Sequence, residues 1–283
     1  MRWINKRHKK NRKYGHAIVR KFLHDGWNKN LMKYVNTGYD ELKGERKMER
    51  LLLKEQGYYC CYCMRAISIK NKTTLEHILP RKTKADNHYA ICYYLNTACY
   101  MKKYVKWADE PPRQRMENPP YPHYCAYENL VASCDGSVWD MSNPDALAST
   151  IHNTCNNVRS DQRIVPMFYD PQIERRLVYE RDGELTYNEA KFSETINAIK
   201  LEHATLKLIR KSWAQIVNNQ HIIEDVKRAI DDEQLRQDIL GELKLSVADI
   251  DFLRRKNIWR LLYEYRWFYD YFKYRKNKIK FLR

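Results

Sequence analysis

The chain has 283 residues, 43% of them hydrophobic, so it is long enough to bury a substantial core. No run of 18 apolar residues occurs, which argues against a membrane-spanning helix. The basic start, residues 1–13, is not followed by the apolar stretch of a secretory signal, so we expect a cytoplasmic protein. In a reducing compartment, the eight cysteines favour metal or redox chemistry over disulfides.

The net charge of +17 is concentrated at the two ends of the chain. Residues 1–57 hold 16 Lys and Arg against 6 Asp and Glu, and residues 254–283 hold 11 against 2. The middle of the chain is therefore close to neutral. Such basic ends suit a polyanionic partner, and nucleic acid is the polyanion that we favour. A basic surface that serves solubility alone is the alternative.

The first two segments of the chain differ in pattern. Residues 1–57 form a basic segment with apolar residues at helical spacing, and Gly57 is suited to end its last helix. Residues 58–170 hold the side chains with chemical character and contain a long insertion at residues 81–128. We expect an α+β fold in which this second segment is the core and most of the rest is helical.

The third segment, residues 171–283, opens with two short apolar runs around Arg181-Asp182-Gly183, which predicts a hairpin. An apolar stripe from Ile196 to Val217 predicts a helix, and another is expected between His221 and Leu240. The last helix is expected to begin at Ser246, a capping residue, and to run without a break through Phe272.

Four cysteines are the candidate zinc ligands. Cys60 and Cys63 have the two-residue gap that lets two thiolates close on one tetrahedral Zn²⁺, although a redox pair has the same spacing. We take Cys134 and Cys155 as the second pair because each lies close to another motif, with buried free thiols as the alternative. The other cysteines are interpreted as structural, with a second metal site at His88 or His123 as the alternative; they are Cys61, Cys92, Cys99 and Cys125.

Residues 55–161 carry a series of motifs, made of Glu55-Gln56-Gly57, Cys60, Tyr62, Cys63, Glu76, His77, Pro80, Asn129, Leu130, Cys155, Asn156, Arg159 and Asp161. These motifs resemble those of HNH endonucleases, which have a ββα-metal core. They are most similar to the Septu-type (PtuB-like) branch, whose members work with an ATPase in bacterial anti-phage defence. The start, residues 1–4, is also similar. The chain departs from the family in an arginine for lysine at Arg159, in the wide Cys134–Cys155 gap and in the insertion.

The resemblance and the chemistry of phosphodiester hydrolysis together suggest a role for each motif residue. A neutral imidazole near a metal can deprotonate water at physiological pH, so His77 is the candidate general base. Glu76 and the side-chain carbonyl of Asn156 are hard oxygen donors for a Mg²⁺ or Mn²⁺ that neutralises the leaving group. The family implies that Asn129 braces the loop after the histidine, and we expect Arg159 to face a phosphate. Turn residues and a solvated arginine are the alternatives for Asn129, Asn156 and Arg159.

The sequence therefore predicts a zinc-stapled ββα nuclease core in a mostly helical frame, which hydrolyses nucleic acid and DNA in preference to RNA. An RNase of the same fold, for example one that cleaves tRNA, and a zinc-stabilised nucleic-acid-binding adaptor without catalysis are the alternatives.

The C-terminal helix carries more aromatic residues than one buried stripe needs, Trp259, Trp267, Phe268 and Tyr271 among them. We therefore expect it to dock on a partner, an ATPase if the resemblance holds. A helix central to its own domain, or one that stacks on single-stranded bases, is the alternative.

Overall fold

A computed structural model describes most of the chain. The described residues are 1–31, 33–34, 41–42, 46–69, 73–80, 101–102, 121–139, 141, 154–160, 162 and 164–280. The helices and short 3₁₀ turns are α1 (Lys9–Asp25), α3 (Arg46–Glu55), η1 (Tyr127–Asn129), α7 (Cys155–Arg159), η2 (Met167–Tyr169), α8 (Ile173–Arg176), α9 (Ala190–Ala198), α10 (Ala204–Asn218), α11 (Ile223–Arg228), α12 (Glu233–Glu242), α13 (Val247–Leu253), α14 (Lys256–Glu264) and α15 (Trp267–Lys280). The strands are β1 (Trp27–Asn28), β2 (Lys33–Tyr34), β3 (Thr73–His77), β4 (Met101–Lys102), β5 (Tyr121–Pro122), β6 (Leu130–Cys134), β7 (Leu177–Tyr179) and β8 (Leu185–Tyr187).

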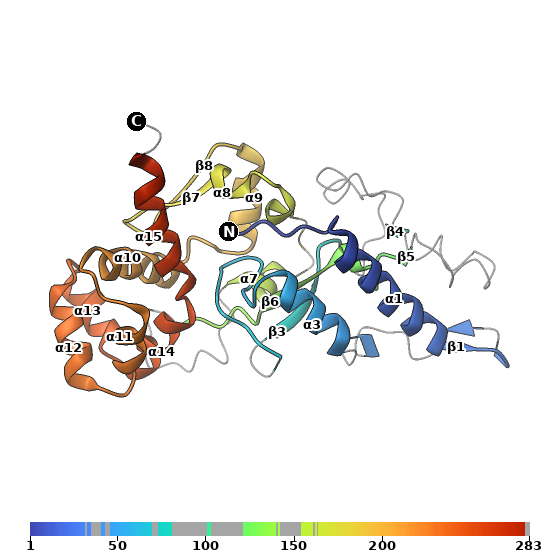
Figure 1. The fold of residues 1–283 in the computed structure, drawn as a ribbon, viewed down its shortest axis with the longest axis horizontal. Coiled ribbons are helices and arrows are strands. Elements are labelled where there is room, and N and C mark those ends of the chain that lie inside the picture. Colours follow the sequence, from blue (N-terminus) through green and yellow to red (C-terminus); the bar gives the residue numbers. More distant parts are fainter. Residues whose placement is uncertain are drawn as a thin grey trace.

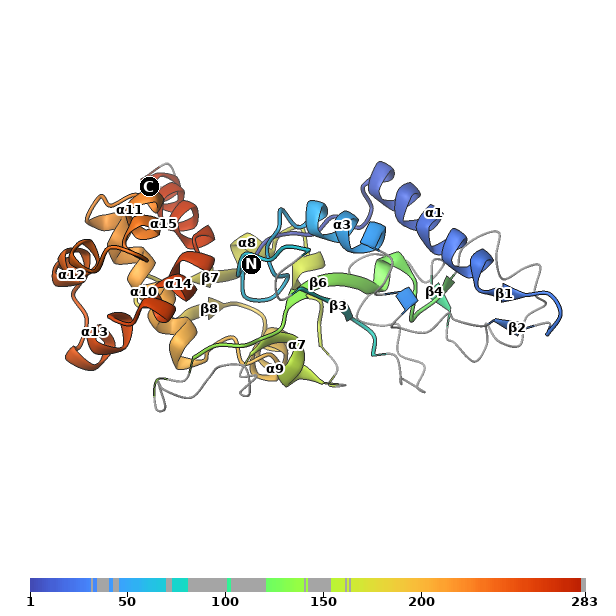
Figure 2. The same ribbon diagram turned by 90° about the horizontal axis from the view of Figure 1, so that it is seen from below.

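The molecule is elongated, with helices at both ends and a small strand pair between them (Figure 1, Figure 2). Helix α1 and the β1–β2 pair lie at one end, and helices α10–α15 pack together at the other. The fold is α+β, as the sequence predicts. Among the described residues, no helix combines the length and the apolar character that crossing a bilayer requires.

Strands β3 and β6 and helix α7 form a strand–strand–helix unit in the middle of the molecule. The strands are antiparallel, with Thr73 opposite Cys134 and His77 opposite Leu130. All five residues of β6 are buried, which fits its apolar sequence and its place between α3 and α7. The unit therefore has the chain order expected of the predicted core.

Two helices of the basic N-terminal segment pack over this unit. The apolar face of α1 is buried, and Gly15 lets the helix approach Tyr127 so closely that a Cβ would lie 2.5 Å from the ring. Helix α3 ends as predicted at Gly57, whose φ is +64°. There, the amides of Tyr58 and Gly57 donate to the carbonyls of Leu53 and Lys54 at 2.8 and 3.2 Å, which closes the helix end.

The predicted hairpin is present as β7 and β8, which pair Leu177 with Tyr187 and Tyr179 with Leu185. Gly183 has a φ of +94°, and a Cβ there would lie 2.2 Å from the carbonyl oxygen of Lys207. Glycine is therefore required by backbone conformation and by space.

Each of the three long helices predicted for the C-terminal half is broken. The stripe from Ile196 to Val217 is divided between α9 and α10, with Lys200 in the left-handed region at φ +46°. The helix expected between His221 and Leu240 is two helices, α11 and α12. The last one begins at Ser246, whose hydroxyl accepts from the Asp249 amide at 3.2 Å, but it is divided into α13, α14 and α15.

These breaks explain the excess of aromatic residues. Because the chain turns between helices, side chains that would cover several faces of one long helix all reach the core. Trp259 and Phe268 are fully buried, and Trp267 and Tyr271 pack against the same core. These four aromatics therefore find neighbours within the chain, and the excess of aromatic residues by itself no longer requires a partner. Docking of the C-terminal region on a partner stays a prediction.

Candidate active site and metal centre

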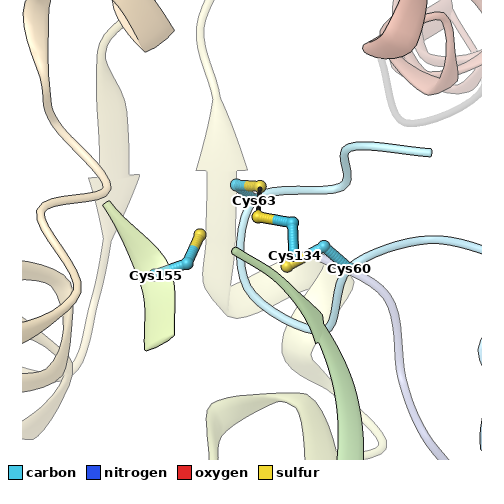
Figure 3. A group of neighbouring side chains, drawn as sticks. All are labelled: Cys60, Cys63, Cys134 and Cys155. Atoms are coloured by element: carbon cyan, nitrogen blue, oxygen red, sulfur yellow. Dashed lines mark hydrogen bonds between the residues drawn. The ribbon is translucent and has the colours of Figure 1, made fainter. Parts of the chain in front are cut away.

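The four predicted zinc ligands lie together at one end of the β3–β6 pair (Figure 3). Their sulfur atoms are all within 4.8 Å of one another, and those of Cys63 and Cys134 are 3.6 Å apart. A tetrahedral Zn²⁺ with Zn–S bonds of about 2.3 Å requires sulfur atoms about 3.8 Å apart. All the described cysteines are free thiols, and these four are buried. The cluster can therefore hold a metal such as zinc.

Local structure brings the four sulfurs together from separate elements. Cys60 and Cys63 lie in a tight turn in which the Cys60 amide donates to the Arg65 carbonyl at 2.8 Å. Met64 completes the turn at φ +66°. Cys134 ends β6 and Cys155 begins α7, so the strand–helix unit supplies the second pair although 20 residues separate its members.

The cluster favours at least one thiolate. Burial alone would raise the pKa of the Cys60 thiol, but hydrogen bonds with Cys134, Cys155 and Cys61 lower that pKa to about 5. Burial keeps the pKa of Cys155 well above its ordinary value. A divalent cation would promote deprotonation of the whole set, because thiolates are the ligands that zinc binds.

His77 ends β3, and only 7% of it is exposed. Its Nε2 lies 2.6 Å from the carbonyl oxygen of Tyr124. Because a carbonyl oxygen only accepts, Nε2 carries the proton, and Nδ1 is then the basic nitrogen of the neutral ring. The ring is thus held in the one tautomer whose Nδ1 can take a proton.

Asn129 braces the loop that follows His77. Its side-chain oxygen accepts from the Leu79 amide at 2.7 Å, and its side-chain nitrogen donates to the carbonyls of Leu79 and His123 at 3.0 and 2.7 Å. The residue is fully buried, so these bonds are not shared with solvent. These bonds tie Leu79, in the loop after β3, to the segment that precedes β6, and so hold the backbone next to His77.

Arg159 does not face solvent, and this corrects the expectation of a phosphate contact. Its guanidinium is 1% exposed and forms an ion pair with the Glu76 carboxylate. It also donates to the carbonyls of His77 at 2.7 Å and Ile78 at 2.6 Å. The physical reason is the burial of Glu76, whose carboxylate would otherwise lie unpaired beneath α7.

Glu76 is therefore a poorer metal ligand in this structure than the sequence predicts. The oxygen that binds Arg159 also accepts from the Tyr62 hydroxyl at 3.0 Å. Burial raises the pKa of the Glu76 carboxyl, although Arg159 and Tyr62 oppose that shift. Asn156, the other expected oxygen donor, is half-buried, and its side-chain nitrogen donates to Thr74 Oγ1 at 3.1 Å. Glu76 is thus in β3 and Asn156 contacts β3 through Thr74, but Glu76 is engaged by Arg159.

The remaining candidates divide in two. Cys61 and Cys125 are buried thiols, and burial raises the pKa of each. Within the described ranges, the four-cysteine cluster is the only group of three or more His, Cys, Asp or Glu side chains placed to hold a metal, and His123 does not belong to it. His88, Cys92, Cys99 and Asp161 lie outside the described residues.

Two contributors were not predicted as site residues. The buried Gln56 side chain pairs with Ala132 in β6, donating to its carbonyl at 2.7 Å and accepting from its amide at 2.8 Å. Tyr62, between the cysteines of the first pair, binds Glu76. Both residues stand within the motifs that carry the resemblance, which was the available signal, but sequence alone did not reveal their contacts.

Comparisons of the chain with protein-family models, with curated proteins and with solved structures found no match.

Proposed function

We propose that this chain is a metal-dependent endonuclease of the HNH type, stapled by one structural zinc, that hydrolyses nucleic acid and favours DNA. The observation that carries the proposal is the setting of His77. The histidine ends β3, its Nε2 is fixed by the Tyr124 carbonyl, and Asn129 braces the loop that follows. A structural histidine does not require this combination of fixed tautomer and braced loop, whereas a general base does.

In the proposed reaction, Nδ1 of His77 takes a proton from the attacking water. The bond from Nε2 to the Tyr124 carbonyl stabilises the protonated ring, because that N–H is retained when the ring gains a charge. Asn129 keeps the histidine in position by fixing the adjacent backbone. The family chemistry adds a Mg²⁺ or Mn²⁺ that neutralises the leaving oxygen. Because Glu76 is paired with Arg159 and Asn156 with Thr74, these two residues do not form a ready oxygen site for such an ion.

The Glu76–Arg159 pair is also the observation that favours the rival function. A nucleic-acid-binding adaptor would retain the zinc centre and use the buried ion pair only for stability. An ATPase partner rests on the Septu-type resemblance alone, because two of the aromatic residues that suggested a docking face, Trp259 and Phe268, are buried within this chain and the other two, Trp267 and Tyr271, pack against the same core.

The test is cleavage of supercoiled plasmid and of total RNA by purified protein, each with Mg²⁺ or with EDTA. We expect Mg²⁺-dependent cleavage of the plasmid. His77→Ala should reduce the rate by about 100-fold or more, the usual contribution of a general base. His221→Ala is the control, since that histidine lies in the C-terminal helices and pairs with Glu242 at 3.0 Å. Cleavage of RNA alone would favour the RNase, and binding without cleavage of either substrate would favour the adaptor.

A further inference from the structure

The corner between α14 and α15 lies against the turn that carries Cys60 and Cys63. The Tyr265 hydroxyl is 3.5 Å from the Cys63 sulfur, and the Ala66 amide donates to the Glu264 carbonyl at 2.8 Å. Tyr265 is fully buried, so water does not compete for its hydroxyl. A side chain 202 positions away in sequence is thus a hydrogen-bond donor to one of the four sulfurs.

Electrostatics make this contact important. Four thiolates and one Zn²⁺ together carry two net negative charges, and the four sulfurs are buried. A buried charge is costly unless hydrogen-bond donors or opposite charges compensate it. Tight metal binding therefore requires hydrogen-bond donors or cations near the four sulfurs.

Arg65 is the nearest cation in sequence, and its guanidinium is buried. It binds the Glu264 carboxylate at 2.5 Å and lies 3.6 Å from that of Asp135. Two carboxylates share its charge, so hydrogen-bond donors to the sulfurs are also needed.

We propose that Tyr265 belongs to the outer shell of the metal centre and donates a hydrogen bond to the Cys63 thiolate. This rests on the zinc proposed above. Tyr265 is a positioning residue, because it does not bind the metal. In this arrangement the C-terminal helices complete a site whose ligands all come from residues 60–155.

The test is Tyr265→Phe, which removes one oxygen and keeps the ring. We expect zinc affinity, measured by competition with a chelator, to fall roughly 10–100-fold, as it does when outer partners of a metal ligand are removed. In the Co²⁺-substituted protein, sulfur-to-metal charge-transfer absorption should shift to lower energy, because the thiolate loses a hydrogen bond. Tyr269→Phe is the control: that ring is also buried on α15 but lies against Trp213.

Unchanged zinc affinity in Tyr265→Phe, or equal weakening by Tyr269→Phe, would overturn the outer-shell role of Tyr265. Wild-type protein without metal would overturn it too, whereas the nuclease proposal depends on the cleavage assay.

Discussion

Replacing Arg159 with methionine tests whether the buried ion pair with Glu76 stabilises the fold. Methionine keeps the length and the apolar stem of the side chain but removes the charge and the donors. The change leaves the Glu76 carboxylate, of which 5% is exposed, with Tyr62 as its remaining side-chain donor. It also leaves the carbonyls of His77 and Ile78 without their guanidinium partner.

The expected loss is large. Removing one partner of a buried ion pair typically costs about 3–5 kcal/mol, because the other charge stays buried. A folded domain is stable by about 5–15 kcal/mol, so Arg159→Met should remove a large part of the free energy of unfolding. Adding Glu76→Gln removes the stranded charge, and the double variant should therefore be more stable than Arg159→Met alone.

The effect should depend on pH in a defined direction. In the folded wild type, burial already raises the pKa of Glu76, and loss of Arg159 removes one of the groups that oppose the shift. A carboxyl whose folded pKa exceeds its unfolded pKa contributes stability below the unfolded value, and that contribution is lost as pH rises through the folded value. Arg159→Met should therefore lose less stability at pH 5 than at pH 8.

Urea unfolding of the wild type, both single variants and the double variant at the two pH values measures these quantities. If Arg159→Met were within about 0.5 kcal/mol of wild type at pH 8, the size of an ordinary surface substitution, the compensating role would be refuted. Weakened DNA binding with unchanged stability would restore the phosphate contact expected from the sequence.

Three further outcomes are expected. Metal analysis of purified protein should find one equivalent of zinc, and soluble, active protein with less than half an equivalent would contradict this. Cys134→Ser should lose the metal and unfold the core, as metal analysis and circular dichroism would show. Brief EDTA treatment should stop cleavage while the zinc and the fold remain, and Mg²⁺ or Mn²⁺ should restore it, whereas full activity in EDTA would argue against an exchangeable ion. Deletion of residues 245–283 should give insoluble or zinc-poor protein, because it removes Tyr265 and the Leu262 carbonyl that binds Trp213 at 3.0 Å; a soluble, zinc-loaded product would refute this.

Local signals in the sequence predicted local structure well. Gly57 is predicted to end a helix, Gly183 to lie in a hairpin turn and Ser246 to start a helix, and in the structure both glycines have positive φ and the Ser246 hydroxyl caps α13. The four clustered cysteines were also identified, although Cys134 and Cys155 lack regular metal-ligand spacing. In each case a residue type has few structural uses, so its identity limits the possible structures.

What the sequence could not give depends on contacts between distant segments. The breaks at Lys200 and between α14 and α15 carry no proline or glycine, because tertiary packing rather than local propensity produces them. The sequence predicts Arg159 to be a surface cation. Its burial follows from its ion pair with Glu76, 83 residues earlier, and the sequence does not show that α7 packs on the strand that carries Glu76.

The β3–β6 pair links the metal centre to the candidate catalytic residue. Thr73, opposite the ligand Cys134, and His77, opposite Leu130, are the two ends of one five-residue ladder. A slip of one residue would turn every side chain of β3 to the other face, which would separate His77 from Tyr124 and Glu76 from Arg159. Zinc bound as proposed would fix the Cys134 end of the ladder, and the Asn129 side chain fixes the other end. The proposed zinc would then affect the proposed reaction without touching substrate, because it would hold the register that positions His77.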